Sequence, residues 1–313
     1  MRFDDSFFET EVRDGFEVPS IMKHAWAAQI ELMEEIREIC DRHGIRFFAD
    51  YGTLLGTVRH KGYIPWDDDL DIGMLRADLR HFLEVAQYEL PQNCHILNMH
   101  TNSNYRDTMT RVINADHVSL EPSHMQKYHD CPFVVGVDIF PYDYVTRDKE
   151  ELESVVTILG AIGEVMKIVW GTVDDSVKGD AVKQIEMLCG VNFDWGKPID
   201  RQLMDLYENL TTMYTEEESD RVGIYTSMVR KKSIDYCFDK EWFSSFIEMP
   251  FENTTIPVPV GYDALLKRRF GDYMTPRITF AHGYPFYKSQ MDEIRDNILK
   301  EPERADQWKK YLI

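Results

Sequence analysis

The sequence has little of what marks a membrane, secreted or zinc-binding protein. No stretch approaches the roughly 18 consecutive apolar residues of a membrane span. Residues 1–5 lack the basic start and apolar run of a secretory signal. The 5 cysteines include no Cys-x-x-Cys pair, so we expect neither a disulfide framework nor a structural zinc site. These absences predict reduced thiols and a cytoplasmic protein.

Positive charge is also scarce. The chain has 35 basic and 55 acidic residues, which give a formal net charge of −20. Such a surface repels polyanions, so we expect no nucleic-acid partner. A small phosphorylated ligand remains compatible with this charge if a divalent cation or a few basic residues neutralise it locally. Apolar residues make up 43% of the 313, enough for a sizeable core.

Hydrophobic spacing predicts alternating helices and strands. Apolar residues at steps of three and four predict a helix over residues 21–43. The order of elements favours an α/β or α+β first half and a more helical second half. The predicted strands are 45–49, a segment after a turn within 63–74, 95–99, 109–114, 134–140, 222–227 and 254–260. The other predicted helices are 54–58, 77–88, 148–168, 202–215, 261–270 and 288–300, and 171–200 is interpreted as a connector.

The most informative segment is Asp67-Asp68-Asp69-Leu70-Asp71, with four carboxylates in five positions. On a strand, Asp67, Asp69 and Asp71 would share one face, where like charges repel. A bound Mg²⁺ or Mn²⁺ would reverse that repulsion, because hard cations bind carboxylate oxygens. The alternatives are a solvated acidic turn and an EF-hand calcium loop. The EF-hand pattern fits poorly, because its sixth position would be Ile72 rather than glycine.

Two further features accompany this segment. Gly52-Thr53 follows a predicted strand and opens a helix, where backbone N–H groups can receive a phosphate, although such a pair is also an ordinary turn. Asp138 lies inside an apolar strand, where an isolated carboxylate is costly unless it is paired or binds a metal. Its alternative role is to cap a neighbouring loop.

Together these pieces resemble the signature of the nucleotidyltransferase superfamily. The longer string from Tyr51 to Ile72 resembles the core motif of the LicD family, which includes bacterial phosphocholine transferases and fukutin-related ribitol-phosphate transferases. The stretch 138–141 (DIFP) and the stretch 268–274 (RRFGDYM), in which Phe270 replaces a usual tyrosine, support the likeness. The resemblance implies an α+β fold with a nucleotidyltransferase-like mixed sheet flanked by helices, and a more helical second half.

The resemblance also implies an activity, namely metal-dependent transfer of phosphocholine or a related phospho-alcohol from a CDP-linked donor to a sugar hydroxyl, with release of CMP. The acceptor would be a surface glycan or teichoic-acid-type precursor, and a lipid-linked one would place the enzyme at the inner membrane face. Asp69, Asp71 and Asp138 are the predicted catalytic residues, and with Asp67 they are the predicted ligands of Mg²⁺ or Mn²⁺. Asp138 is alternatively the base that accepts the hydroxyl proton.

A glycine, a threonine and several basic residues are the predicted contacts to the donor. Each basic residue also has a structural alternative. Arg59, His60 and Lys61 could form a solvated basic turn. Arg111 could make a contact at the sheet edge, and His282 could have a structural role. A choline head group would need an aromatic cage. The predicted donor-binding residues are Gly52, Thr53, Arg59, His60, Lys61, Arg111 and His282. The cage candidates are Tyr142, Tyr144, Trp170, Tyr273, Tyr284 and Tyr287.

Two other functions stay open. The same acids would serve a nucleotidyltransferase that attacks the nucleotide α-phosphate, or a non-catalytic module that binds a metal or nucleotide. We expect three regions, namely a nucleotidyltransferase-like catalytic core over residues 1–145, a mainly helical insertion over 146–250, and a C-terminal segment over 251–313 that completes the active site.

Overall fold

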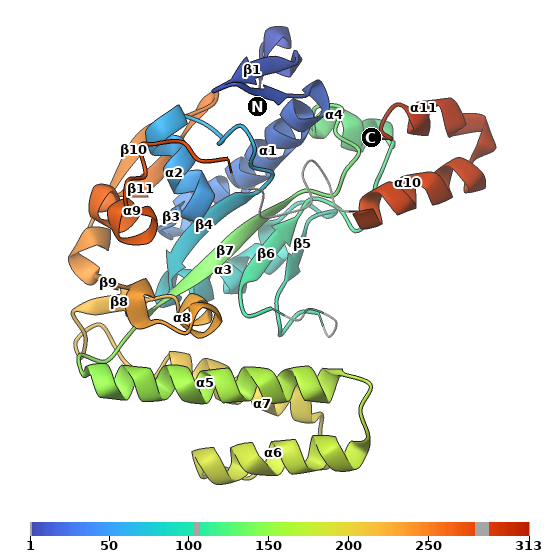
Figure 1. Cartoon of the computed structure of the whole chain (residues 1–313). Helices are drawn as coiled ribbons and strands as arrows, with labels where there is room; N and C mark the ends of the chain where they lie inside the picture. The colour runs from blue at the N-terminus through green and yellow to red at the C-terminus, as the bar shows by residue number, and fades with distance from the viewer. Residues whose placement is uncertain (1, 103–104, 106, 279–287, 313) are drawn as a thin grey trace.

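A mixed sheet forms the centre of the computed structural model, which describes residues 2–102, 105, 107–278 and 288–312. Five strands lie in the order β3-β4-β7-β6-β5, and β8 and β9 extend the sheet from the far end of β7 (Figure 1). The bounds are β3 Phe48–Ala49, β4 Leu70–Leu75, β5 His95–Leu97, β6 Thr110–Ile113, β7 Gly136–Tyr144, β8 Arg221–Gly223 and β9 Cys237–Asp239.

The central pair, β4 and β7, runs parallel, whereas the other paired strands of this sheet are antiparallel. Every residue of β4 is buried, as are most of those of β7, because helices cover both faces of the sheet. Such strands are nearly continuous apolar runs. The α+β class with a mixed sheet flanked by helices is therefore confirmed.

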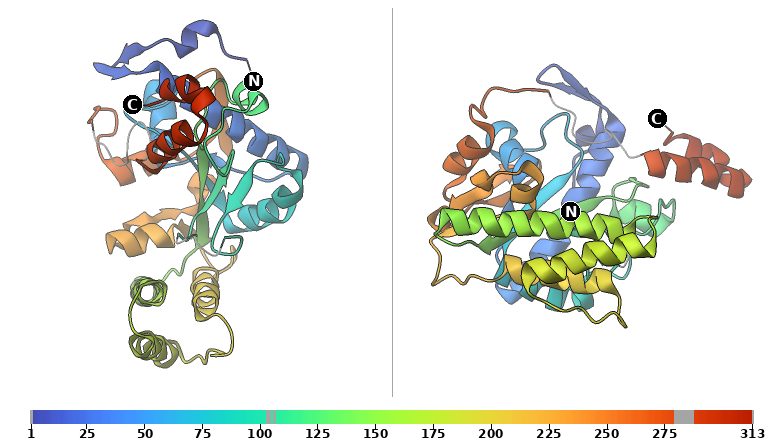
Figure 2. Two further views of the ribbon diagram at one scale, coloured as in Figure 1. Left: turned by 90° about the vertical axis from the view of Figure 1, so that its right-hand side faces the viewer. Right: turned by 60° about the horizontal axis from the view of Figure 1, so that its bottom comes forward.

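Helices α1 (Ser20–His43) and α3 (Arg76–Glu89) lie on one face of this sheet, and α2 (Tyr51–His60) and α9 (Tyr262–Phe270) lie on the other (Figure 2). The α1 helix buries a full apolar stripe that includes Trp26, Ile30 and Met33. It ends at Gly44, whose φ of 65° forms a left-handed cap. The acidic segment before β4 therefore lies between α1 on one face of the sheet and α2 on the other.

A layer of three helices packs below the sheet in Figure 1, formed by α5 (Lys149–Trp170), α6 (Asp175–Cys189) and α7 (Ile199–Thr211). Its apolar residues form a core of their own, separate from the core around the sheet. Leu159, Val182 and Leu203, one from each helix, are buried in it.

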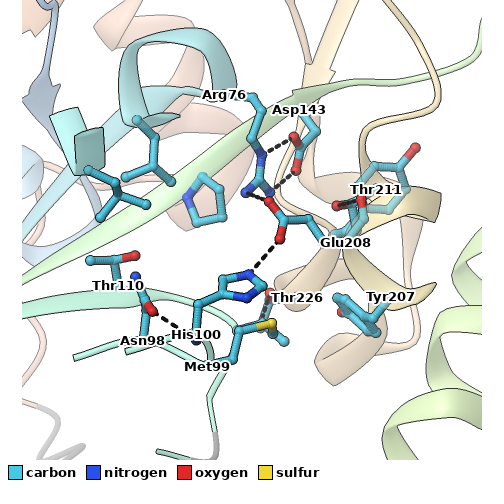
Figure 3. A pocket seen from close by; sticks show the side chains of 15 residues that line it. Arg76, Asn98, Met99, His100, Thr110, Asp143, Tyr207, Glu208, Thr211 and Thr226 are labelled. Atoms are coloured by element: carbon cyan, nitrogen blue, oxygen red, sulfur yellow. Dashed lines mark hydrogen bonds and ion pairs between the residues drawn. The ribbon is translucent and has the colours of Figure 1, made fainter. Parts of the chain in front are cut away.

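An ion-pair network attaches this layer to the sheet (Figure 3). Arg76 at the start of α3 donates to both carboxylate oxygens of Asp143 on β7, at 2.7 and 2.8 Å. Glu208 on α7 lies 3.5 Å from Arg76 and is hydrogen-bonded to His100 at 2.7 Å. The Glu208 hydrogen bond raises the pKa of His100, and the same bond lowers the pKa of Glu208. The adjoining cavity is about 40 Å³, room for water but not for a substrate.

The C-terminal part of the chain returns to the sheet. Strands β10 (Phe246–Phe251) and β11 (Thr254–Pro259) form a hairpin beside β3 and α2 and lead into α9. At the hairpin turn, Glu252 accepts hydrogen bonds from Arg13 at 2.6 Å and from the backbone N–H of Tyr63 at 2.9 Å. The hairpin therefore fixes the loop that runs from α2 toward the aspartates.

The remaining elements lie at the ends of the chain and between the elements above. Helix α10 (Lys288–Lys300) is joined to the core through Gln290. The side-chain amide of Gln290 accepts from the backbone N–H of Val134 at 2.9 Å and donates to its carbonyl at 3.0 Å. The remaining bounds are η1 Asp5–Phe8, β1 Glu11–Arg13, β2 Phe16–Val18, α4 Pro122–Lys127, α8 Tyr225–Lys231, η2 Ile234–Tyr236, η3 Lys240–Phe243, η4 Pro302–Arg304 and α11 Ala305–Lys309.

Most predicted helices occur within two residues of their predicted ends, but three predicted segments are wrong in part. The 171–200 connector contains helix α6, which is amphipathic and ends at a left-handed Gly190. Strand β8 stops at Gly223, because the chain turns there into α8. Strand β4 begins only at Leu70, so Asp67 and Asp69 lie in the preceding loop and not on a strand face.

Tight packing around Gly73 on β4 gives a test of this arrangement. A Cβ built there would lie 2.4 Å from the Phe48 ring and 2.8 Å from the Tyr142 ring, whereas one at Gly163 on α5 meets nothing within 4 Å. We expect Gly73→Ala to destabilise the fold by about 1–3 kcal/mol. We expect the control Gly163→Ala to stabilise it by about 0.5–1 kcal/mol, because alanine favours helix. Urea unfolding measures both, and equal effects would contradict the packing described.

Candidate active site

Three charged side chains form a row across the middle of the sheet. The strand register places Asp71 on β4 beside Asp138 on β7, and Asp138 beside Arg111 on β6. Asp69 precedes Asp71 by two residues and joins the row from the loop. One carboxylate oxygen each from Asp69, Asp71 and Asp138 lie within 4.8 Å of one another. The structure thus brings together the three predicted catalytic acids.

Helix α1 holds the loop that carries the acids. The indole N–H of Trp26 donates to the carbonyl of Asp67 at 3.1 Å, and the side-chain amide of Gln29 donates to the carbonyl of Asp68 at 2.9 Å. Trp26 also stacks on Tyr63, with ring centroids 4.7 Å apart. These contacts fix the backbone of the loop that carries the acids.

The charged form of Asp71 is destabilised by burial and by neighbouring carboxylates. Burial raises the pKa of Asp71 well above its usual range, and the charges of Asp69, Asp138, Asp67 and Asp50 raise it further. A divalent cation would neutralise like charges that the fold otherwise holds together at a cost. Oxygen-only ligands from three carboxylates suit Mg²⁺ or Mn²⁺, so this donor set fits such an ion.

Arg111 is paired with a predicted metal ligand. Its guanidinium donates to both oxygens of Asp138, one of them at 2.5 Å, in a two-bond fork. The sequence suggested either a phosphate contact or a sheet-edge contact for Arg111, and the structure places it at the carboxylates. A carboxylate oxygen has further lone pairs, so the fork still leaves Asp138 able to bind a cation.

The Gly52-Thr53 turn lies directly over the acidic loop. A Cβ built at Gly52 would lie 2.3 Å from a carboxylate oxygen of Asp67, so any larger residue displaces that carboxylate. The hydroxyl of Thr53 accepts a hydrogen bond from the backbone N–H of Asp71 at 2.7 Å. Asp67 therefore faces the turn, and it lies in a second acidic trio with Asp68 and Asp69 rather than in the trio with Asp71 and Asp138.

Arg59 and His60, at the end of α2, are held by other groups. Arg59 donates to the carbonyl of Tyr273 at 2.8 Å, and His60 lies 2.8 Å from the carboxylate of Asp14. Burial lowers the pKa of both Arg59 and His60. Lys61 is exposed and adopts a left-handed conformation. Their predicted donor contacts stay predictions, as does that of His282, which lies outside the described residues.

The candidate choline cage is dispersed. Tyr142 is fully buried and hydrogen-bonded to Asp50 at 2.9 Å, and the hydroxyl of Tyr273 donates to Asp263 at 2.8 Å. Trp170 ends helix α5 in the separate helical layer. Tyr284 and Tyr287 lie outside the described residues. No cage of these six can be assigned from the residues that the structure describes.

Sequence reasoning missed a buried group beside the site. Asp50 accepts from the backbone N–H of Tyr51 at 2.9 Å, so it caps α2, and its carboxylate is paired with Arg269 of α9. Both side chains are almost fully buried, with 0% and 2% exposure. In the sequence, an aspartate between a strand and the start of a helix indicates a helix cap. It does not indicate the ion pair, because Arg269 lies 219 residues from Asp50.

Comparison with known proteins relates this mixed sheet and its acidic side chains to one family. Residues 44–154 match the family model described as the LicD/FKTN/FKRP nucleotidyltransferase domain. Over these residues the chain is therefore similar to the nucleotidyltransferase domain of the LicD family. The matched range includes Asp69, Asp71, Arg111 and Asp138.

Individual relatives differ in how much they share. Lipopolysaccharide cholinephosphotransferase LicD of Haemophilus influenzae is 24% identical over 262 residues, which cover 78% of this chain and 88% of that protein. An uncharacterized protein of Rickettsia typhi is 45% identical over 62 residues, which cover 20% of this chain and 19% of the relative. The human ribitol 5-phosphate transferase FKRP is 39% identical over 41 residues, or 13% of this chain and 8% of FKRP.

Because the charged form of Asp71 is destabilised in the folded protein, we expect Asp71→Asn to raise the stability of the metal-free protein and to weaken metal binding. A carboxylate whose folded pKa is raised destabilises the fold at pH values above its unfolded pKa, so Asp71→Asn at pH 7 removes that cost. Without divalent ions we expect Asp71→Asn to melt at least about 2 °C higher than wild type, the shift that roughly 1 kcal/mol produces in a chain of comparable size.

With saturating Mg²⁺ or Mn²⁺ we expect wild type to gain stability, since a ligand that binds the folded state raises it, and the Asp71→Asn variant to gain little. Differential scanning fluorimetry with and without the ion measures both effects. The control is Asp116→Asn, at a carboxylate that is 65% exposed and pairs with His95. A lower melting temperature for metal-free Asp71→Asn would contradict the repulsion described here.

Proposed function

We propose that this protein transfers phosphocholine, or a related phospho-alcohol, from a CDP-linked donor to a sugar hydroxyl. The acceptor oxygen forms a new bond to the phosphorus that carries the alcohol, the bond from that phosphorus to CMP breaks, and the acceptor proton passes to a base. The observation that carries the proposal is the trio of the half-buried Asp69 and the buried Asp71 and Asp138, inside a domain matched to the LicD family.

In this proposal Asp69, Asp71 and Asp138 hold Mg²⁺ or Mn²⁺, and Asp67 assists from the loop. When bound, the ion would neutralise the donor phosphates and polarise the phosphorus–oxygen bond. The like charges around Asp71 support this assignment, because a bound cation would relieve their repulsion. Gly52 supports it too, since the absence of a side chain lets the chain run close to the Asp67 carboxylate.

Two residues of the row have distinct proposed tasks. Arg111 orients Asp138 through its fork and offers a guanidinium to the donor phosphates, as phosphoryl transfer depends mainly on positioning and charge. Because both oxygens of Asp138 already accept from Arg111, the ligand role suits Asp138 better than the base role. The Arg59-His60-Lys61 segment and His282 remain proposed donor contacts.

The substrate class rests on relatives. The Haemophilus influenzae protein is named a cholinephosphotransferase that acts on lipopolysaccharide, and FKRP is named a ribitol 5-phosphate transferase. We propose choline as the first alcohol to test, because the former aligns over 88% of its length. A surface-glycan or teichoic-acid-type precursor is the proposed acceptor. In the described part of the chain, no helix combines the length and apolarity needed to cross a bilayer.

Turnover of CDP-linked donors tests this proposal. Wild type is incubated with Mg²⁺, a glycan acceptor and CDP-choline, CDP-ribitol, CDP-glycerol or CDP-ethanolamine, and nucleotide products are separated by chromatography. We expect CMP with one of these donors, and at least a 100-fold loss of rate in Asp69→Asn and Asp71→Asn, since both remove a charged ligand from the site. The exposed Asp116→Asn variant again serves as the control.

The nucleotide product separates the alternatives. Release of pyrophosphate from a nucleoside triphosphate, without CMP from any CDP donor, would favour nucleotidyl transfer at the α-phosphate. Metal-dependent binding of CDP-choline without turnover, over varied acceptors, would favour a binding module. Wild-type rates in Asp69→Asn and Asp71→Asn would contradict the proposed mechanism itself.

A further inference from the structure

We propose that Arg269 is a positioning residue for the transfer site, which it serves by holding the Tyr51-Gly52 turn through its buried ion pair with Asp50. The chemistry of this role rests on the proposed function. The geometry rests on contacts between α9, near the C-terminal end of the chain, and the turn that opens α2.

The Arg269–Asp50 pair is buried and shares the hydroxyl of Tyr142. The guanidinium of Arg269 donates from Nη1 to Asp50 and from Nη2 to the hydroxyl of Tyr142, the latter at 2.5 Å. The same Tyr142 hydroxyl lies 2.9 Å from both carboxylate oxygens of Asp50. With exposures of 2% for Arg269 and 0% for Asp50, water cannot replace either partner. Breaking such a pair from one side leaves an uncompensated buried charge.

Asp50 connects this pair to the catalytic strand. Its backbone N–H donates to the carbonyl of Asp71 at 3.0 Å, and its carbonyl accepts from Leu54 at 2.9 Å as the first turn of α2 forms. Its carboxylate caps the helix through the N–H of Tyr51. A shift of Asp50 therefore moves both the start of α2 and the backbone of a proposed metal ligand.

Tyr51 shows what the pair has to hold. Its φ of 37° is left-handed, which is uncommon for a bulky residue and must be maintained by surrounding contacts. The Arg269 guanidinium lies 4.3 Å from the Tyr51 ring centroid, and the Tyr51 hydroxyl is hydrogen-bonded to Ser227 of α8. This bend brings Gly52 so close to the Asp67 carboxylate that a side chain at position 52 would not fit.

Arg269 therefore acts through the turn, because it is bonded to Asp50 and Tyr142, which are not among the three central acids. A purely structural role would affect folding alone, whereas a positioning role predicts loss of turnover in variants that still fold. Arg269→Lys keeps the charge but loses the planar fork that serves both Asp50 and Tyr142. Asp50→Asn/Arg269→Met removes both charges, so it leaves no unpaired ion in the core. Tyr142→Phe keeps the ring and removes only the shared hydroxyl.

The experiment measures kcat and KM for the CDP-linked donor that wild type uses, with melting temperature and far-UV circular dichroism as folding controls. We expect at least a tenfold fall in kcat/KM for Arg269→Lys and for the double variant, and a smaller fall for Tyr142→Phe, because small misplacements of reacting groups are costly. The matched control is Arg268→Met, at the adjacent arginine, which is 48% exposed and pairs with Asp235. We expect it to stay within twofold of wild type.

Mn²⁺ affinity, measured by calorimetry on the same proteins, separates this inference from the proposed function. We expect Arg269→Lys to weaken Mn²⁺ binding severalfold, through the displaced backbone of Asp71. If wild type uses no CDP-linked donor, the proposed function fails and Mn²⁺ affinity alone decides the positioning role. Folded Arg269→Lys and Tyr142→Phe proteins with wild-type Mn²⁺ affinity and, where there is turnover, wild-type kcat/KM would overturn it.

Discussion

The repulsion among Asp69, Asp71 and Asp138 is the constraint around which this molecule is organised. Their oxygens approach within 4.8 Å, and Asp71 and Asp138 are buried. Burial and like charge together raise the pKa of Asp71 well above its usual range. A fold retains such an arrangement only if the surrounding structure holds the acids in place, and the interactions around the site do this from several directions.

Segments distant in sequence supply that support. Helix α1 fixes the acidic loop through Trp26 and Gln29, and β6 supplies the Arg111 fork to Asp138. The C-terminal part supplies Arg269 to the turn and Glu252 to the loop before the acids. Rigid support from outside the reacting groups is what phosphoryl transfer requires, because its catalysis depends on position and electrostatics.

Local patterns in the sequence predicted much of this structure. The 3.6-residue periodicity located α1, α3 and α5, and the acidic string with Asp138 located the centre of the site. Alternation along a strand predicts Asp67 on the same face as Asp71, but β4 starts three residues after Asp67. Alternation along a strand could not show where the strand begins, and the loop instead directs Asp67 toward Gly52.

Long-range pairing was beyond what the sequence could indicate. Asp50 and Arg269 are ordinary residues in their local context, and only the packing of α9 beside α2 makes them partners. The same holds for Arg76, Asp143 and Glu208, which join the helical layer to the sheet. Charged groups buried in pairs have no periodic signature, because each is neutralised by a residue far along the chain.

We propose that one divalent cation binds beside the two central parallel strands, held by Asp69, Asp71 and Asp138. Anomalous diffraction from crystals grown with Mn²⁺ tests it most directly. We expect a manganese peak within coordination distance of Asp69, Asp71 and Asp138, with Arg111 still beside Asp138. A peak confined to Asp67 and Asp68, or none at saturating Mn²⁺, would contradict it.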